Sequence, residues 1–147
     1  MSTSTIDLGS RKAAERVNSP GKVYWITGLS GSGKTTLGRE LWSRLRAAGH
    51  RAILLDGDAL RATMAEDLGH GVSDRRQSAM RNARLCKLLA DQGFDVICAT
   101  ISLFHAVQRW NRENIPAYRE IYLRVPIDEL RRRDSKGIYA ESERTET

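Results

Sequence analysis

Short apolar runs alternate with amphipathic segments along most of the chain, and this alternation predicts a regular series of strands and helices. The expected strands span residues 22–27, 51–56, 94–101 and 119–125. The expected helices span residues 34–49, 75–93, 103–114 and 127–134, and residues 57–69 are expected to form a short helix and its exit turn. A strand followed by a helix occurs four times, which predicts a doubly wound α/β fold: a parallel sheet with helices on both faces, in three layers.

Two local patterns refine this prediction. Residues 94–101 form a nearly unbroken apolar run, as expected for a strand that helices cover on both faces. Asp74 is followed by Gln77 three residues later, and this spacing predicts that Asp74 caps the start of a helix.

The two ends of the chain are polar and lack this periodicity. We expect residues 1–21 to form a flexible N-terminal arm and residues 140–147 to form a disordered tail. Residues 22–139 are then one folded domain, because a chain of 147 residues is long enough for one domain with one core.

The composition is that of a globular protein with a basic surplus: 40% of residues are hydrophobic, 29% are charged, and the net charge is +6. This surplus suits an anionic ligand such as a nucleotide. The basic residues are scattered and only 6% of residues are aromatic, so we expect no nucleic-acid partner.

The lengths of the apolar runs and the positions of the cysteines indicate the cellular compartment. No apolar run approaches the ~20 residues of a membrane span, and the first residues contain no apolar signal region. We therefore expect a cytoplasmic protein without a membrane partner. Cys98 lies inside an apolar run, so we expect Cys86 and Cys98 to be free thiols rather than a disulfide.

Residues 28–36, "GLSGSGKTT", contain the full pattern G-x-x-x-x-G-K-[ST] between an expected strand and an expected helix. Glycines let backbone N–H groups turn inward around phosphates, and the N-terminus of the following helix adds positive potential. We expect Lys34 to reach the β- and γ-phosphates of a nucleotide and the Thr35 hydroxyl to bind Mg²⁺.

Two carboxylates, Asp56 and Asp58, follow the second expected strand. In a doubly wound sheet this edge faces the ligand crevice. One carboxylate can help to hold Mg²⁺, while the other can accept a proton from an attacking hydroxyl. The alternative is a polar turn in which Asp58 caps the next helix.

Several further polar residues are candidates for ligand contacts. Arg61 lies one helical turn after Asp58, and Arg75 lies near a helix start, where a cation is mildly unfavourable, so an anion contact is favoured. Arg81 is equally consistent with a solvated surface residue. Ser102 ends the third strand, where it is placed either for a ligand or as a helix cap.

The phosphate loop alone does not determine which molecule accepts the phosphate. A GTPase would carry an Asn-Lys-x-Asp motif, which this sequence lacks. A motor or ATPase would carry an acidic residue after an apolar strand, but residues 94–101 are followed by Ser102. A kinase with a small-molecule acceptor fits better, because its acceptor lies over the end of the second strand.

The segments "GLSGSGKTTL", "LDGDALR", "VICATIS" and "RDSKGIY" resemble the adenylylsulfate kinase family in order and spacing, over about residues 22–139. The resemblance implies a P-loop kinase that transfers the γ-phosphate of ATP to the 3′-hydroxyl of adenosine 5′-phosphosulfate and yields 3′-phosphoadenylylsulfate. Its implied cofactors are ATP and Mg²⁺, and its partner is a nucleotide acceptor.

The resemblance also implies a role for each matching residue. The implied ATP contacts are Gly28, Ser30, Gly31, Ser32, Gly33, Lys34, Thr35 and Thr36, with Arg133 from a mobile lid that follows a helix. The implied acceptor contacts are Asp58, Arg61, His70, Arg75, Ser78, Ile101, Ser102 and the lid residue Lys136. Thr35 and Asp56 are the implied magnesium ligands, and Lys34, Asp58 and Ser102 are the implied catalytic residues.

Departures from the family pattern gather on the acceptor side. Ser78 stands where the family has an asparagine that holds the acceptor, and Met80 stands where it has an arginine. Leu103 replaces a proline, and His70 takes the place of an aromatic residue that stacks on the acceptor base. These differences favour, as an alternative, a kinase for another nucleotide hydroxyl, such as that of a cytidine that carries a phosphoramidate.

The family pattern also continues beyond "GIY" with a lid segment, a last strand and a C-terminal helix, and we expect these to be missing from this sequence. An inactive ATP-binding relative is therefore a further alternative. Without that last strand, the strand at residues 22–27 is expected to lie at an open edge of the sheet, where a homodimer can form.

Overall fold

The computed structural model describes residues 19–134 and residue 137. The elements in chain order are β1 (Val23–Thr27), α2 (Lys34–Ala47), β2 (Ala52–Asp56), α3 (Gly57–Met64), α4 (Val72–Asp91), β3 (Asp95–Thr100), α5 (His105–Asn114), β4 (Tyr118–Tyr122) and α6 (Ile127–Arg133). Each element has the type that the hydrophobic pattern predicts. The predicted tail at residues 140–147 and most of the predicted arm at residues 1–21 lie outside the described residues.

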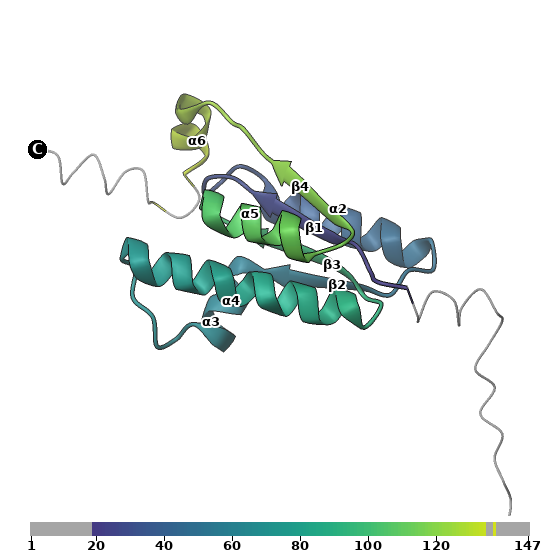
Figure 1. Ribbon diagram of the computed structural model, residues 1–147. Coiled ribbons are helices and arrows are strands. Elements are labelled where there is room, and N and C mark those ends of the chain that lie inside the picture. Colours follow the sequence, from purple (N-terminus) through teal and green to yellow (C-terminus); the bar gives the residue numbers. More distant parts are fainter. Residues whose placement is uncertain (1–18, 135–136, 138–147) are drawn as a thin grey trace, which may run out of the picture.

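All four strands of the sheet are parallel, in the order β2-β3-β1-β4. Helix α2 lies on one face of the sheet, and α4 and α5 lie on the other (Figure 1). The predicted doubly wound α/β fold is therefore confirmed. Because every strand runs in the same direction, the carboxyl ends of all four strands meet at one edge, and the connections that follow them gather there.

The prediction that β1 forms an open edge is wrong. β1 lies between β3 and β4, with Val23 opposite both Val96 and Tyr118. β4 supplies the backbone partners that the prediction assigned to a later strand. Within the described residues the edge strands are β2 and β4, so the proposed homodimer loses the edge on which it rested and stays untested.

The main core lies between the sheet and helices α3, α4 and α5. Trp25, Cys98, Ala83 and Val107 are each 0% exposed there. On the other face, α2 approaches the sheet closely at Gly38. A Cβ atom at this position would lie 3.3 Å from Leu54 Cδ1, so glycine sets the distance between helix and sheet.

Helix α4 begins three residues earlier than predicted, and Asp74 does not cap it. The N-cap residue is Gly71, which makes no side-chain cap hydrogen bond. Asp74 Oδ2 instead accepts a hydrogen bond of 2.9 Å from the Gly69 backbone N–H. The carboxylate thus binds the turn before the helix and not the first helical turn.

Candidate active site

The connection from β1 to α2 is a glycine-rich turn that leads directly into a helix. Gly31 and Gly33 have φ angles of 81° and 96°, which only glycine adopts at low cost. Helix α2 begins directly after this turn at Lys34, and its first turn contains no acidic residue. The positive end of the helix dipole is therefore uncompensated and favours an anion at the loop.

Two side chains of the loop, those of Lys34 and Ser32, differ in their hydrogen bonding. Lys34 Nζ donates a hydrogen bond of 2.8 Å to the Leu29 carbonyl, so the ammonium group reaches across the loop. Ser32 is 7% exposed, and its hydroxyl has no hydrogen-bond partner within the described part of the chain. A buried polar atom of this kind is costly unless a ligand or water satisfies it.

Helix α2 and strand β2 place one hydroxyl and one carboxylate side by side. Thr35 Oγ1 donates a hydrogen bond of 3.0 Å to Asp56 Oδ1. Mg²⁺ prefers hard oxygen ligands and is often held by one or two protein groups together with phosphates and water. The donor set therefore fits Mg²⁺ beside a bound triphosphate, although no cluster of three or more metal-binding side chains occurs among residues 19–134.

Asp58 lies in the first turn of α3, directly after the end of β2. The N-cap residue of α3 is Asp56, and no side chain caps this helix, so the predicted capping role of Asp58 is wrong. Its carboxylate is exposed and lines the cavity described next. Asp58 is therefore accessible to a ligand.

A cavity of about 880 Å³ lies along this edge of the sheet. It brings together fifteen residues from the sequence prediction, from both its ATP side and its acceptor side. They are Ser30, Gly31, Gly33, Lys34, Thr35, Thr36, Asp56, Asp58, Arg61, His70, Arg75, Ser78, Ile101, Ser102 and Arg133. Gly28 and Ser32 do not line it, and Lys136 lies outside the described residues.

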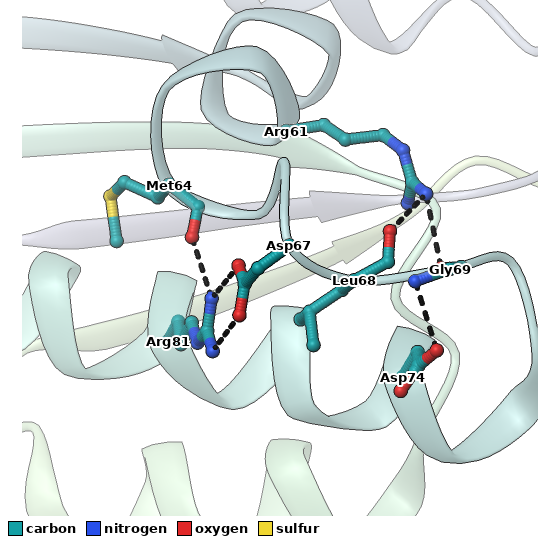
Figure 2. Close-up of polar contacts among 7 residues, drawn as sticks. All are labelled: Arg61, Met64, Asp67, Leu68, Gly69, Asp74 and Arg81. Atoms are coloured by element: carbon teal, nitrogen blue, oxygen red, sulfur yellow. Dashed lines mark hydrogen bonds and ion pairs between the residues drawn. The ribbon is translucent and has the colours of Figure 1, made fainter.

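Arg61 is held in place by the connection between α3 and α4. Its Nη2 atom donates to the carbonyls of Leu68 and Gly69 at 3.2 and 3.0 Å (Figure 2). The same atom lies 3.5 Å from His70 Nε2. Arg75, in the first turns of α4, is exposed at the mouth of the cavity. Two guanidinium groups from different helices thus face one ligand space.

Arg81 has a structural role instead. Its guanidinium donates to the Met64 carbonyl at 2.7 Å and to both carboxylate oxygens of Asp67 (Figure 2). These hydrogen bonds lower the pKa of the Asp67 carboxyl. Arg81 does not line the cavity, so its position favours support of the α3–α4 connection, which carries the backbone that holds Arg61.

The end of β3 forms the polar wall of the cavity. Ser102 is 7% exposed, and its hydroxyl lies 3.0 Å from the Thr100 hydroxyl. The N-cap residue of α5 is Phe104, and no side chain caps it, so the predicted capping role of Ser102 is wrong. Ile101 is half exposed beside these hydroxyls.

Arg133 approaches the loop from α6. The sequence placed it in a lid after a helix, but it is the last residue of the helix itself. Arg133 Nη1 donates a hydrogen bond of 3.1 Å to the Gly31 carbonyl, and its Nε atom donates to Glu129. Hydrogen bonds from Arg132 and then Arg133 lower the pKa of Glu129 to about 2.

Sequence reasoning did not identify every residue of the cavity. The additional lining residues are Leu29, Gly57, Ala79, Asn82, Ala99, Thr100 and Phe104. The signal that could have revealed some of them is helical spacing: Ala79 and Asn82 lie four and seven residues after Arg75, on the same face of α4.

The remaining sequence predictions concern the thiols and the membrane. Cys86 and Cys98 are buried and free, as predicted. A hydrogen bond with Cys86, together with burial, raises the pKa of the Cys98 thiol. Among the described residues, no helix is both long and apolar enough to cross a membrane.

Comparisons with known proteins agree with this geometry. The family model described as Adenylylsulphate kinase matches residues 20–147. An adenylyl-sulfate kinase from Paraburkholderia xenovorans is 43% identical over 127 residues, which cover 86% of this chain and 71% of the relative. A cytidine diphosphoramidate kinase from Campylobacter jejuni is 42% identical over 123 residues, which cover 82% of this chain and 70% of the relative.

The fold has a counterpart of known structure as well. The APS kinase of Mycobacterium tuberculosis, solved in complex with AMPPNP and APS, superposes with a TM-score of 0.80 and is 34% identical. The superposition covers 88% of this chain and 77% of that structure.

Proposed function

Because this chain belongs to the adenylylsulfate kinase family of phosphotransferases, we propose that it transfers the γ-phosphoryl group of ATP to the 3′-hydroxyl of adenosine 5′-phosphosulfate. The observation that carries this proposal is the single cavity of about 880 Å³, which has a phosphate loop at one end and a carboxylate with two arginines at the other. The related Mycobacterium tuberculosis structure holds an ATP analogue and APS together.

At the ATP end, the backbone of residues 28–33 and the start of α2 bind the phosphates. The Lys34 ammonium leaves the Leu29 carbonyl, which it reaches at 2.8 Å, for the more negative β- and γ-phosphates. Thr35 and Asp56 hold Mg²⁺, which neutralises phosphate charge when it is bound. Arg133 lies against the carbonyl of Gly31 and extends the positive surface of this end.

At the acceptor end, Asp58 is the general base. Its carboxylate accepts the proton of the attacking hydroxyl as the new bond forms between the hydroxyl oxygen and the γ-phosphorus. The bond between that phosphorus and the β–γ bridging oxygen breaks, and ADP leaves with the bridging oxygen. Asp58 suits this role because it is exposed in the cavity and free of a capping role.

The charged 5′ group of the acceptor is placed at the arginines. Arg61 and Arg75 present planar donors that suit sulfate and phosphate oxygens. Ser78, Ile101 and Ser102 line the wall of the same space, and His70 lies beside Arg61. We assign these residues to acceptor binding, with the Ser102 hydroxyl close to the reacting atoms.

A specific observation supports a second acceptor. The Campylobacter jejuni relative named cytidine diphosphoramidate kinase is 42% identical to this chain, and the Paraburkholderia relative named adenylyl-sulfate kinase is 43% identical. Identity therefore does not separate the two substrates, and a cytidine diphosphoramidate is the alternative acceptor.

The test is a transfer assay with ATP that is labelled at the γ-phosphate. The full chain is incubated with adenosine 5′-phosphosulfate, with cytidine diphosphoramidate and with no acceptor, and the labelled products are separated. Label in 3′-phosphoadenylylsulfate is the expected result, and label in the cytidine product selects the alternative. If ATP binds and neither acceptor gains label, the chain is an inactive ATP-binding relative and the kinase proposal fails.

A further inference from the structure

Asn82, on the inner face of α4, presents a neutral amide to the cavity. The residue is 5% exposed, and it lines the cavity. Its amide atoms are not among the fully buried polar atoms that lack a hydrogen-bond partner in the described part of the chain, which places the amide on the cavity wall rather than in the closed core. An amide on the wall of a cavity offers one donor group and one acceptor to a ligand there.

Asn82 ends a stripe of residues that leads from the mouth of the cavity into the protein. Arg75, Ser78, Ala79 and Asn82 follow one another at helical spacing and all line the cavity. Arg75 is exposed, Ser78 is half buried and Asn82 is buried. A cation therefore stands at the open end of the stripe and a neutral amide stands at the closed end.

The surroundings of Asn82 suit a flat, neutral and polar group. Phe104 is half buried and adds an apolar surface to the same cavity, while its ring also packs against the core and lies 5.7 Å from the Arg76 guanidinium. Ala79, three residues before Asn82 on the same helix, contributes a small side chain to the cavity wall. An anionic group, by contrast, binds more strongly to the arginines than to an amide.

We propose that the Asn82 amide hydrogen-bonds the edge of the acceptor's nucleobase, an inference that rests on the proposed function because it takes the acceptor to be a nucleotide. An amide presents one carbonyl acceptor beside one N–H donor. Adenine and cytosine each present an amino donor beside an unprotonated ring nitrogen, so both match the amide with two hydrogen bonds.

The test measures binding rather than turnover. The chain is first saturated with AMPPNP to occupy the phosphate loop, and AMP, CMP and ribose 5-phosphate are then titrated by calorimetry. Ribose 5-phosphate carries the charged group without a base. Asn82→Ala should weaken the better-bound of AMP and CMP by about 5- to 100-fold. It should leave the affinities for AMPPNP and ribose 5-phosphate unchanged.

Two further variants make the result specific. Asn82→Asp keeps the size of the side chain but replaces the N–H donor with an acceptor, so it should weaken AMP and CMP as well. Asn111→Ala is the matched control, because Asn111 is a buried asparagine at 0% exposure that does not line the cavity. It should lower the melting temperature without a change in either nucleotide affinity.

Three outcomes overturn the inference: unchanged nucleotide affinity in Asn82→Ala, an equal loss for ribose 5-phosphate, or a parent chain that binds AMPPNP but neither AMP nor CMP. The transfer assay separates this failure from that of the proposed function. Transfer of label with an unchanged Asn82→Ala variant rejects only the role of Asn82. A base-dependent loss of binding without transfer of label rejects only the kinase proposal.

Discussion

The two ends of the cavity are built in different ways. The ATP end is formed largely by one continuous segment, residues 28–36, in which backbone N–H groups and a helix start face the ligand. The acceptor end is formed by side chains from α3, α4 and the end of β3, which only the fold brings together. The ATP end is therefore determined by a local sequence motif, whereas the acceptor end depends on the packing of separate elements.

This difference has a consequence for substitutions. A backbone loop binds phosphate whatever acceptor is present, so changes there should affect every reaction of the chain. Side chains from three elements can be exchanged one at a time, so changes there should alter the choice of acceptor while ATP binding persists. Kinetic constants for ATP and acceptor, measured separately, test this comparison.

The largest effect is expected for Lys34→Ala. Its ammonium group neutralises charge as the γ-phosphoryl group moves, and its loss should lower kcat on the order of 10³-fold. The side chain is half buried and contacts the Leu29 carbonyl within the loop, outside the hydrophobic core, so the melting temperature should change little. Lys87→Ala, which removes an exposed pair with Asp91 outside the cavity, is the control. Undiminished turnover of Lys34→Ala would remove the loop lysine from the mechanism.

Asp58→Asn is expected to be next in size. It removes the base but keeps the shape of the side chain, and kcat should fall by roughly 10²-fold, at the lower end of general-base effects. The KM for ATP should change little, because Asp58 lies on α3 and not on the loop. Asp91→Asn, at the far end of α4, serves as the control. A collapse of ATP binding with a surviving kcat would show that Asp58 acts on the nucleotide instead.

Arg75→Ala should act on the acceptor alone. A lost charge-assisted contact should raise the acceptor KM by roughly tenfold, with the KM for ATP unchanged. Arg75 is a cleaner probe than Arg61, whose guanidinium also holds the carbonyls of Leu68 and Gly69. Arg84→Ala, on an exposed position of the same helix, is the control. Equal increases in both KM values would contradict the division of the cavity into two ends.

The same division explains what the sequence could and could not predict. The strand–loop–helix unit around Lys34 follows from local chemistry, and the parallel sheet follows from the repeated strand–helix pattern. The edge position assigned to β1 was wrong because strand order depends on which later strand pairs with it, and β4 does so. Asn82 was missed because a single asparagine within a helix carries no local signal, and its place in the cavity comes from packing.

The contacts of Arg133 were beyond local reasoning for the same reason. The charge run "RRRD" does not reveal that the third arginine ends α6 and reaches Gly31, which lies far away in the sequence. Glu129, one helical turn earlier, anchors this arginine. The Glu129–Arg133 pair thus connects α6 to the ATP end of the cavity. The rest of that end comes from one continuous segment, whereas this contact joins residues far apart in the sequence.

Glu129→Gln should have the smallest effect of these substitutions, and it tests whether the Arg133 contact matters to the ATP end. Because the pKa of Glu129 is lowered to about 2, its carboxylate stabilises the folded chain above the unfolded value near 4.5, and this contribution is lost as the pH falls toward 2. At pH 7 the variant should melt roughly 1–2 °C lower than the parent chain, since the pair is exposed. The difference should shrink below pH 4.5 and vanish near pH 2.

The same variant should bind ATP slightly more weakly, because Arg133 loses the carboxylate that orients it toward the loop, while acceptor binding stays constant. Glu40→Gln, which breaks an exposed pair with Arg44 on α2, provides the matched control for loss of a surface carboxylate. If both variants change ATP affinity equally, the effect is one of net charge. If Glu129→Gln alone does so, α6 contributes to the ATP end by holding Arg133 in place, and that end depends on one long-range contact in addition to its local motif.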